Sequence, residues 1–177
     1  MRQLLLLAPM FLMLAWASVT DLRTRRIPNW LTLTLAVTGI VHSFLPGHLV
    51  TPLHSLLGLL TGFGLNLVLF VLHIRGGGDV KLFAGVGAWI GPLLTFEIFI
   101  VSILVAAVSA LIQATVSGKL TALLRNTGIL AVTLAHSREL GVAHVTRPDG
   151  TFRSVGRPVP YAVPVIIAAF LVLAVNS

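Results

Sequence analysis

The sequence predicts an all-α, polytopic membrane protein in which six helices cross the bilayer. Of its 177 residues, 56% are apolar and only 10% are charged, whereas a soluble domain of this size carries about 25% charged residues. Such a chain cannot cover its own surface with polar groups, so we expect lipid to cover it. Two further observations support this class: the apolar residues form long runs, and the cations fall in alternate loops between them.

The apolar runs define the predicted spans, since about 20 apolar residues cross the hydrocarbon core of a bilayer. Helix breakers such as Pro28-Asn29, Pro46-Gly47 and Gly91-Pro92 separate them. We treat 1–177 as a single membrane domain with one cytoplasmic segment, 117–156. Within it, 121–136 is compatible with a helix on the membrane surface and 142–155 with a small hairpin. The six predicted spans are 3–20, 30–45, 53–73, 80–95, 98–116 and 161–175.

The cations predict the orientation. The 12 Lys and Arg residues fall in or at the edge of the loops after spans one, three and five, with Lys81 at the far edge of the loop after span three and Arg2 as the one exception. Lys and Arg are enriched in cytoplasmic loops. Both termini are therefore predicted to lie outside, with the three basic loops in the cytoplasm.

Small and polar residues in the third span bear on helix packing. Gly58 and Gly62 form a small-xxx-small pair, which favours close helix contact. We expect this contact within the chain rather than in a dimer. We expect Asn66, on the same helix, to hydrogen-bond a neighbouring helix.

Two carboxylates lie at the predicted inner ends of helices. Asp21 closes the first span and Asp79 opens the fourth. Ionisable groups at membrane depth are costly and tend to be functional. The depth of Asp79 depends on whether its helix ends at Gly91-Pro92, which places it well inside the membrane, or continues to Phe96, which places it at the interface. The sequence leaves both alternatives open.

A pair of carboxylates can cut peptide bonds. When two come close together, one keeps its proton near neutral pH, which provides one acid and one base from the same residue type. The chain has no cysteine, and it contains neither G-x-S-x-G nor H-E-x-x-H. The six histidines lack ligand spacing, so we expect no metal and no cofactor.

The residues around the two aspartates strengthen the hypothesis. Gly76-Gly77-Gly78 precedes Asp79 and gives the backbone conformational freedom there. After Asp21, Pro28 keeps Ile27 out of helical geometry and can begin the next helix.

These motifs resemble those of the type IV prepilin peptidases, membrane aspartyl proteases of the G-x-G-D type. The resemblance spans almost the whole chain. It implies that Asp21 and Asp79 are the catalytic pair and that Gly76, Gly78, Lys81, Pro28 and Asn29 support them. The residues that carry it are Gly76-Gly77-Gly78-Asp79, Lys81-Leu82, Gly87, Gly91, Asp21, Ile27-Pro28-Asn29 and Pro160-Tyr161-Ala162.

The resemblance also implies a substrate and a location. Members of this family remove the short leader of pilin-like precursors at the cytoplasmic face of the inner membrane. The partners would be a pilin precursor and membrane lipid, with no nucleic acid. The chain looks like the short form associated with Flp-type tight-adherence pili. It lacks the paired cysteines of members that also methylate the new N-terminus, so we do not expect methylation.

Simpler readings exist for each residue. Asp21 could pair with the neighbouring arginines, Asp79 could be a helix N-cap, Gly76–Gly78 could be a linker, and Lys81 could be a topology anchor. A rival class is a proton- or cation-coupled transporter, and another is a noncatalytic scaffold of a secretion complex. Transporters place their sites near the midplane, between repeats, whereas both aspartates here lie toward one face.

Overall fold

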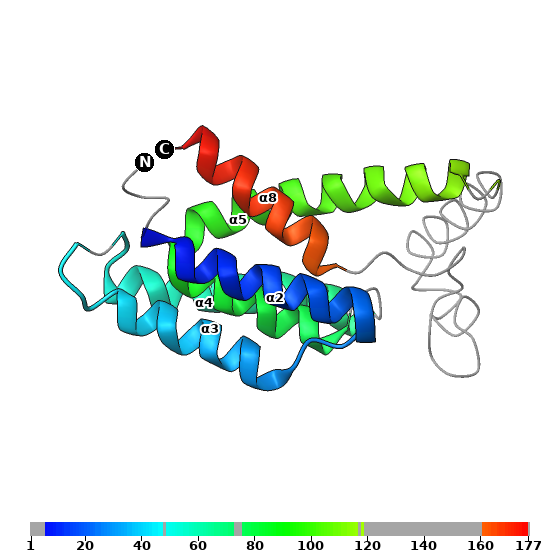
Figure 1. Ribbon diagram of the computed structural model, residues 1–177. Helices are drawn as coiled ribbons and strands as arrows, with labels where there is room; N and C mark the ends of the chain where they lie inside the picture. The colour runs from blue at the N-terminus through cyan, green and yellow to red at the C-terminus, as the bar shows by residue number, and fades with distance from the viewer. Residues whose placement is uncertain (1–5, 48, 73–75, 117, 119–160, 177) are drawn as a thin grey trace, which may run out of the picture. The chain divides into compact units, whose positions relative to one another are not determined.

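The computed structural model describes residues 6–47, 49–72, 76–116, 118 and 161–176. These residues contain helices and no strand, in agreement with the predicted all-α class (Figure 1). The chain divides into two compact units, residues 1–105 with 160–177, and residues 106–159. Both aspartates lie in the first unit. The described residues form five helices, α2 (Ala8–Thr24), α3 (Asn29–His42), α4 (Pro52–Val71), α5 (Gly77–Val116) and α8 (Ala162–Val175).

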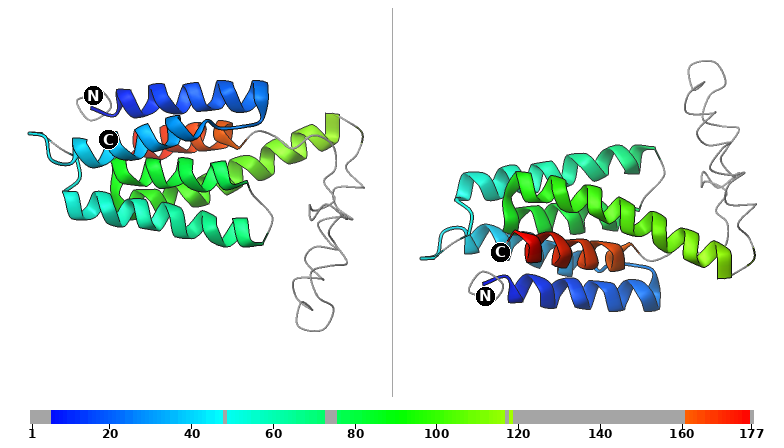
Figure 2. Two further views of the ribbon diagram at one scale, coloured as in Figure 1. Left: turned by 90° about the horizontal axis from the view of Figure 1, so that it is seen from below. Right: turned by 90° about the horizontal axis from the view of Figure 1, so that it is seen from above.

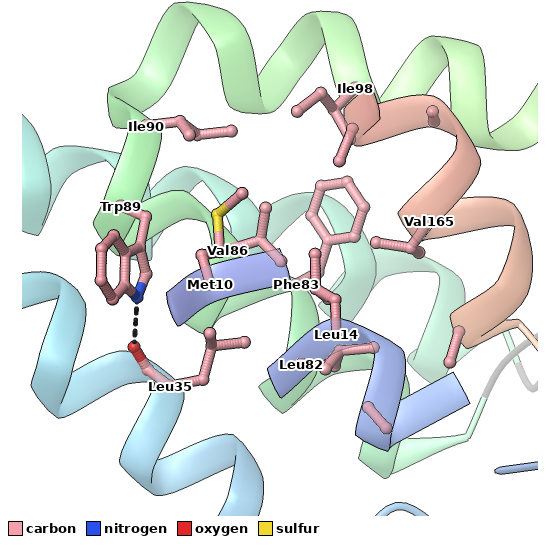
Figure 3. Close-up of a cluster of buried hydrophobic side chains, with 14 of the residues drawn as sticks. Met10, Leu14, Leu35, Leu82, Phe83, Val86, Trp89, Ile90, Ile98 and Val165 are labelled. Carbon is pink, nitrogen blue, oxygen red and sulfur yellow. Dashed lines mark hydrogen bonds between the residues drawn. The ribbon is translucent and has the colours of Figure 1, made fainter. Parts of the chain in front are cut away.

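Helix α5 is a hairpin of two arms rather than one straight helix. Gly91 interrupts it with φ 77° and ψ 177°, a backbone conformation that glycine adopts far more readily than other residues. The rings of Phe83 and Phe99 lie 5.9 Å apart, although sixteen residues of continuous helix would separate them by about 24 Å. The chain therefore turns back at Gly91, as Figure 3 shows between Ile90 and Ile98.

This hairpin corrects one predicted boundary. The fourth and fifth predicted spans, 80–95 and 98–116, both lie within α5, and the break between them falls at Gly91 instead of after Thr95. Of the two alternatives for the helix that carries Asp79, the structure has the shorter one. Its first arm runs from Gly77 to Gly91 and is about 21 Å long.

Local sequence explains where α3 and α4 begin. Pro28, with φ −60° and ψ 133°, is the N-cap of α3, one residue before the helix begins at Asn29, and its carbonyl oxygen accepts the N–H groups of Leu31 and Thr32. Thr51 caps α4 by accepting the N–H of His54 on its hydroxyl, and Pro52 occupies the first turn.

Helices α4 and α5 pack backbone to backbone. A Cβ atom added at Gly58 would lie 2.1 Å from the carbonyl oxygen of Gly87, and one added at Gly62 would lie 2.4 Å from that of Phe83. Ser55 reinforces the contact by donating its hydroxyl to the carbonyl oxygen of Ala88, at 2.6 Å. The predicted packing role of the two α4 glycines within the chain is confirmed.

The first arm of α5 is the centre of the first unit. Residues 82–90 are all buried, and Figure 3 shows Leu82, Phe83, Val86 and Trp89 among side chains of α2, α3 and α8. Trp89 donates its indole N–H to the carbonyl oxygen of Leu35, at 2.9 Å. The buried cluster includes Met10, Leu14, Leu35, Leu82, Phe83, Val86, Ile98 and Val165.

The outer surfaces of the helices are apolar. Large side chains such as Leu12 (72% exposed), Leu33 (66%) and Leu93 (81%) point away from the core. Exposed apolar surface of this extent is typical of contact with lipid. Two helices in the described residues, α4 and α5, are long and apolar enough to cross a membrane, and α8 is a shorter apolar helix. The chain is thus a membrane protein whose described residues form only helices, while six spans and external termini remain predictions.

Two sequence-based expectations lie outside the described residues. These are the surface helix over 121–136 and the hairpin over 142–155.

The α4–α5 contact yields a stability prediction. Gly58→Ala places a methyl group against the backbone of Gly87, so we expect it to destabilise the protein by about 1–3 kcal/mol, as overpacking does. Gly64 lies on the same helix with nothing within 4 Å of an added Cβ, so Gly64→Ala is the matched control and should be neutral or slightly stabilising. Thermal unfolding in detergent measures both. Equal melting temperatures for the two variants would contradict the packing.

Candidate active site

Asp21 lies in the last turn of α2 and is 7% exposed. Its Oδ2 accepts the backbone N–H of Ala162 at 3.2 Å, and Ala162 is the first residue of α8. A helix N-terminus carries partial positive charge and unpaired N–H groups, so it stabilises an anion placed there. Helix α2 ends directly afterwards, because its C-cap residue Arg25 adopts a left-handed conformation and donates its N–H to the carbonyl oxygen of Asp21.

Asp79 lies in the first turn of α5 and is half-buried. Its N–H donates to the carbonyl oxygen of Gly76, at 3.1 Å. Since α5 begins at Gly77, Asp79 is inside the helix, and the alternative reading as its N-cap is wrong. Gly78 is half-buried and Gly76 is exposed.

The segments that follow the first aspartate and surround the second contact each other. A Cβ added at Gly78 would lie 3.6 Å from the Cβ of Ile27. Lys81 donates its ammonium N–H to Oδ1 of Asn29, at 3.0 Å. The end of α2, the start of α3 and the start of α5 therefore lie at the same end of the first unit (Figures 1 and 2). Sequence reasoning named Asn29 and Lys81 separately but did not anticipate that they bond each other.

The second arm of α5 and the start of α8 reach the same end. The hydroxyl groups of Ser102 and Tyr161 lie 2.5 Å apart, and Tyr161 immediately precedes the residue that bonds Asp21. Ser102 is fully buried. Sequence reasoning missed Ser102, whose only signal was a lone polar residue in an apolar run. It also missed the backbone N–H of Ala162, which has no sequence signal.

The hydrogen-bond partner of Asn66 differs from the predicted one. Its Nδ2 donates to the carbonyl oxygen of Gly62 in its own helix, at 3.4 Å, instead of to a neighbouring helix. Its Oδ1 is buried and has no hydrogen-bond partner.

The arrangement suits acid–base chemistry that needs only side chains. One carboxylate accepts a backbone N–H, the other lies in the first turn of the central helix, and both are in the first or last turn of a helix. In the described residues, no three His, Asp or Glu side chains come close enough together to hold a metal ion.

Comparison of the sequence with known proteins places the chain in a family. The sequence profile of the type IV leader peptidase family matches residues 8–111. The chain belongs to the type IV leader peptidase family. The matched region contains Asp21, Asp79 and the motif residues around them, whereas α8 lies beyond it.

Two relatives of this leader peptidase family member carry the name preflagellin peptidase. The one from Methanococcus voltae is 34% identical over 87 residues, which cover 47% of this chain and 36% of the relative. The one from Methanocaldococcus jannaschii is 32% identical over 78 residues, covering 42% and 33%. The alignments thus span about a third of the length of these relatives. No solved structure matches the chain.

The contact between the two motif segments can be measured. We expect Asn29→Ala and Lys81→Met each to weaken it, and their effects on stability to be coupled by about 0.2–1 kcal/mol, the range for exposed polar and charged pairs. A double-mutant cycle on the free energy of unfolding measures this coupling. Strictly additive effects would show that the bond contributes nothing in solution.

Proposed function

We propose that this protein is an aspartic endopeptidase that removes the leader of a pilin-like precursor, with Asp21 and Asp79 as its catalytic residues. One observation carries the proposal. The segment that follows Asp21, from Ile27 to the start of α3, contacts the start of α5, which bears Asp79, through the Asn29–Lys81 bond and the approach of Ile27 to Gly78. Membership in the type IV leader peptidase family supports it.

The surroundings favour distinct roles for the two carboxyl groups. The N–H of Ala162 at the start of α8 stabilises negative charge on Asp21, so Asp21 is the base and Asp79 the acid. Asp21 removes a proton from water as the water oxygen attacks the scissile carbonyl carbon, and Asp79 gives its proton to the carbonyl oxygen. When the tetrahedral intermediate collapses, Asp21 passes its new proton to the leaving amine and Asp79 recovers one from the hydroxyl group.

The site also fits the proposed substrate. A pilin precursor joins a short leader to a hydrophobic helix, and the exposed apolar surface of this protein suits a helix that lies in lipid beside it. The preflagellin peptidases among the relatives are consistent with precursors of this kind. We place the cut at the cytoplasmic face of the inner membrane and propose an Flp-type pilin as the precursor. The motif residues Gly76, Gly78, Pro28, Asn29 and Lys81 shape the site.

Substituting each aspartate tests the proposal. We expect Asp21→Asn and Asp79→Asn each to reduce cleavage of an Flp-type precursor by about 10²–10⁴-fold, the contribution typical of a general acid or base. Cleavage by membranes containing each variant is measured by the mobility shift of the precursor.

Glu97→Gln is the matched control. Glu97 accepts a hydrogen bond from Asn176 and lies near the Gly91 turn, away from Asp79, so this variant should cleave normally. If either aspartate variant is inserted in the membrane and cleaves at the normal rate, the proposed pair is wrong. The carboxylates would then be read as groups of a transporter or a scaffold.

The orientation of the chain in the membrane is testable by cysteine labelling. Because the chain has no cysteine, a single introduced cysteine is the only thiol that a reagent can label. We expect Thr24→Cys, at the exposed end of α2, to face the cytoplasm and Pro46→Cys, in the exposed turn after α3, to face outside. A membrane-impermeant maleimide should label Pro46→Cys in intact cells and Thr24→Cys only after permeabilisation. The reverse pattern would contradict the proposed side of cleavage.

A further inference from the structure

Asn66 has a buried acceptor that the fold leaves unpaired. The residue is 0% exposed, and its Oδ1 has no hydrogen-bond partner. The amide orientation is determined by the Gly62 carbonyl group, which can only accept, so the atom facing it is Nδ2. Leaving a buried acceptor unpaired is costly, and such atoms in native proteins usually have an explanation.

The register of α4 against α5 places Asn66 level with Asp79. The helices run antiparallel, with Gly58 against Gly87 and Gly62 against Phe83. Each step along this contact advances four residues on α4 and goes back four on α5. Residues four apart share a helix face, so the next pair is Asn66 and Asp79.

The contact beyond this pair agrees with the register. A Cβ added at Gly77 would lie 3.6 Å from the ring of Phe70. Phe70 is four residues beyond Asn66 on α4, and Gly77 is two residues before Asp79 on α5. Asn66 is therefore enclosed between two observed α4–α5 contacts, on the face of α4 that is turned to α5.

We propose that Asn66 is a positioning residue for Asp79, its Oδ1 accepting a hydrogen bond from the protonated carboxyl group of Asp79. This inference rests on the proposed function, in which Asp79 is the acid. The bond stabilises the neutral form of the carboxyl group and orients its O–H until the proton passes to the scissile carbonyl oxygen. Asn66 itself exchanges no proton.

The other charged and titratable groups at this end stay unchanged when Asn66 is substituted. Asp21 of α2 accepts the N–H of Ala162, Lys81 of α5 bonds Asn29, and Tyr161 bonds Ser102. Arg25 and Arg26 directly precede Ile27, which lies against Gly78, and the last three turns of α4 contain no ionisable residue. A change in pH dependence on replacing neutral Asn66 thus reports its hydrogen bond and not a lost charge.

The pH profile of precursor cleavage tests the proposal. Asn66→Leu keeps a similar side-chain volume but cannot accept a hydrogen bond. Because the neutral form of Asp79 loses its acceptor, the alkaline limb of the profile should move to lower pH by about half a unit to one unit, the size of one net hydrogen bond. If this variant fails to insert, Asn66→Ala serves in its place.

Ser55→Ala is the matched control. Ser55 is also a fully buried polar residue of α4, and its hydroxyl bonds α5, but at the Gly91 end. Its substitution should lower stability and leave the pH profile unchanged. A profile for Asn66→Leu that superimposes on the wild type, with stability lowered as in Ser55→Ala, would overturn the positioning role.

A second readout does not depend on cleavage. The infrared difference between wild type and Asp79→Asn isolates the carbonyl band of the protonated Asp79 carboxyl group, and in Asn66→Leu this band should disappear at lower pH. Cleavage by Asp79→Asn would refute the proposed function, whereas an unshifted band in Asn66→Leu would refute only the role of Asn66.

Discussion

The left-handed backbone of Gly91 is the constraint on which the rest of the first unit depends. It turns α5 back on itself, so that Phe83 and Phe99 pack together and both arms share one core. A side chain at this position would be strained in that conformation. Because the second arm returns alongside the first, Ser102 reaches the end of the unit where Asp79 begins the helix, and there it bonds Tyr161. The fold-back thus assembles the surroundings of the aspartates.

Close packing then holds the first arm in place. Gly58 and Gly62 let α4 approach until backbones touch, and Ser55 and Trp89 add hydrogen bonds to α4 and α3. In lipid there is little hydrophobic drive between helices, so such contacts and hydrogen bonds are the main sources of helix association. The first arm is consequently surrounded by protein over residues 82–90.

The site uses the ends of helices, where backbone groups are unpaired. Asp21 ends α2 and takes an N–H from the start of α8, while Asp79 stands in the first turn of α5. An isolated carboxylate at membrane depth is costly, and the N–H of Ala162 offsets part of that cost for Asp21. The alternative reading of Asp21 as a partner of nearby arginines does not explain this bond. The proposed roles of base for Asp21 and acid for Asp79 follow from this bond, which supports negative charge on Asp21.

The sequence by itself determined the all-helical membrane class, the family resemblance, the helix boundary next to Pro28 and the two candidate aspartates. These depend on composition, on the geometry of proline and on motifs only a few residues long, which are local properties. Only the tertiary structure decided the break at Gly91, the Asn29–Lys81 and Asp21–Ala162 bonds, and the unpaired acceptor of Asn66. The Asn29–Lys81 and Asp21–Ala162 bonds join residues far apart in the chain. Their partners are set by the register in which the helices pack, and no local pattern encodes that register.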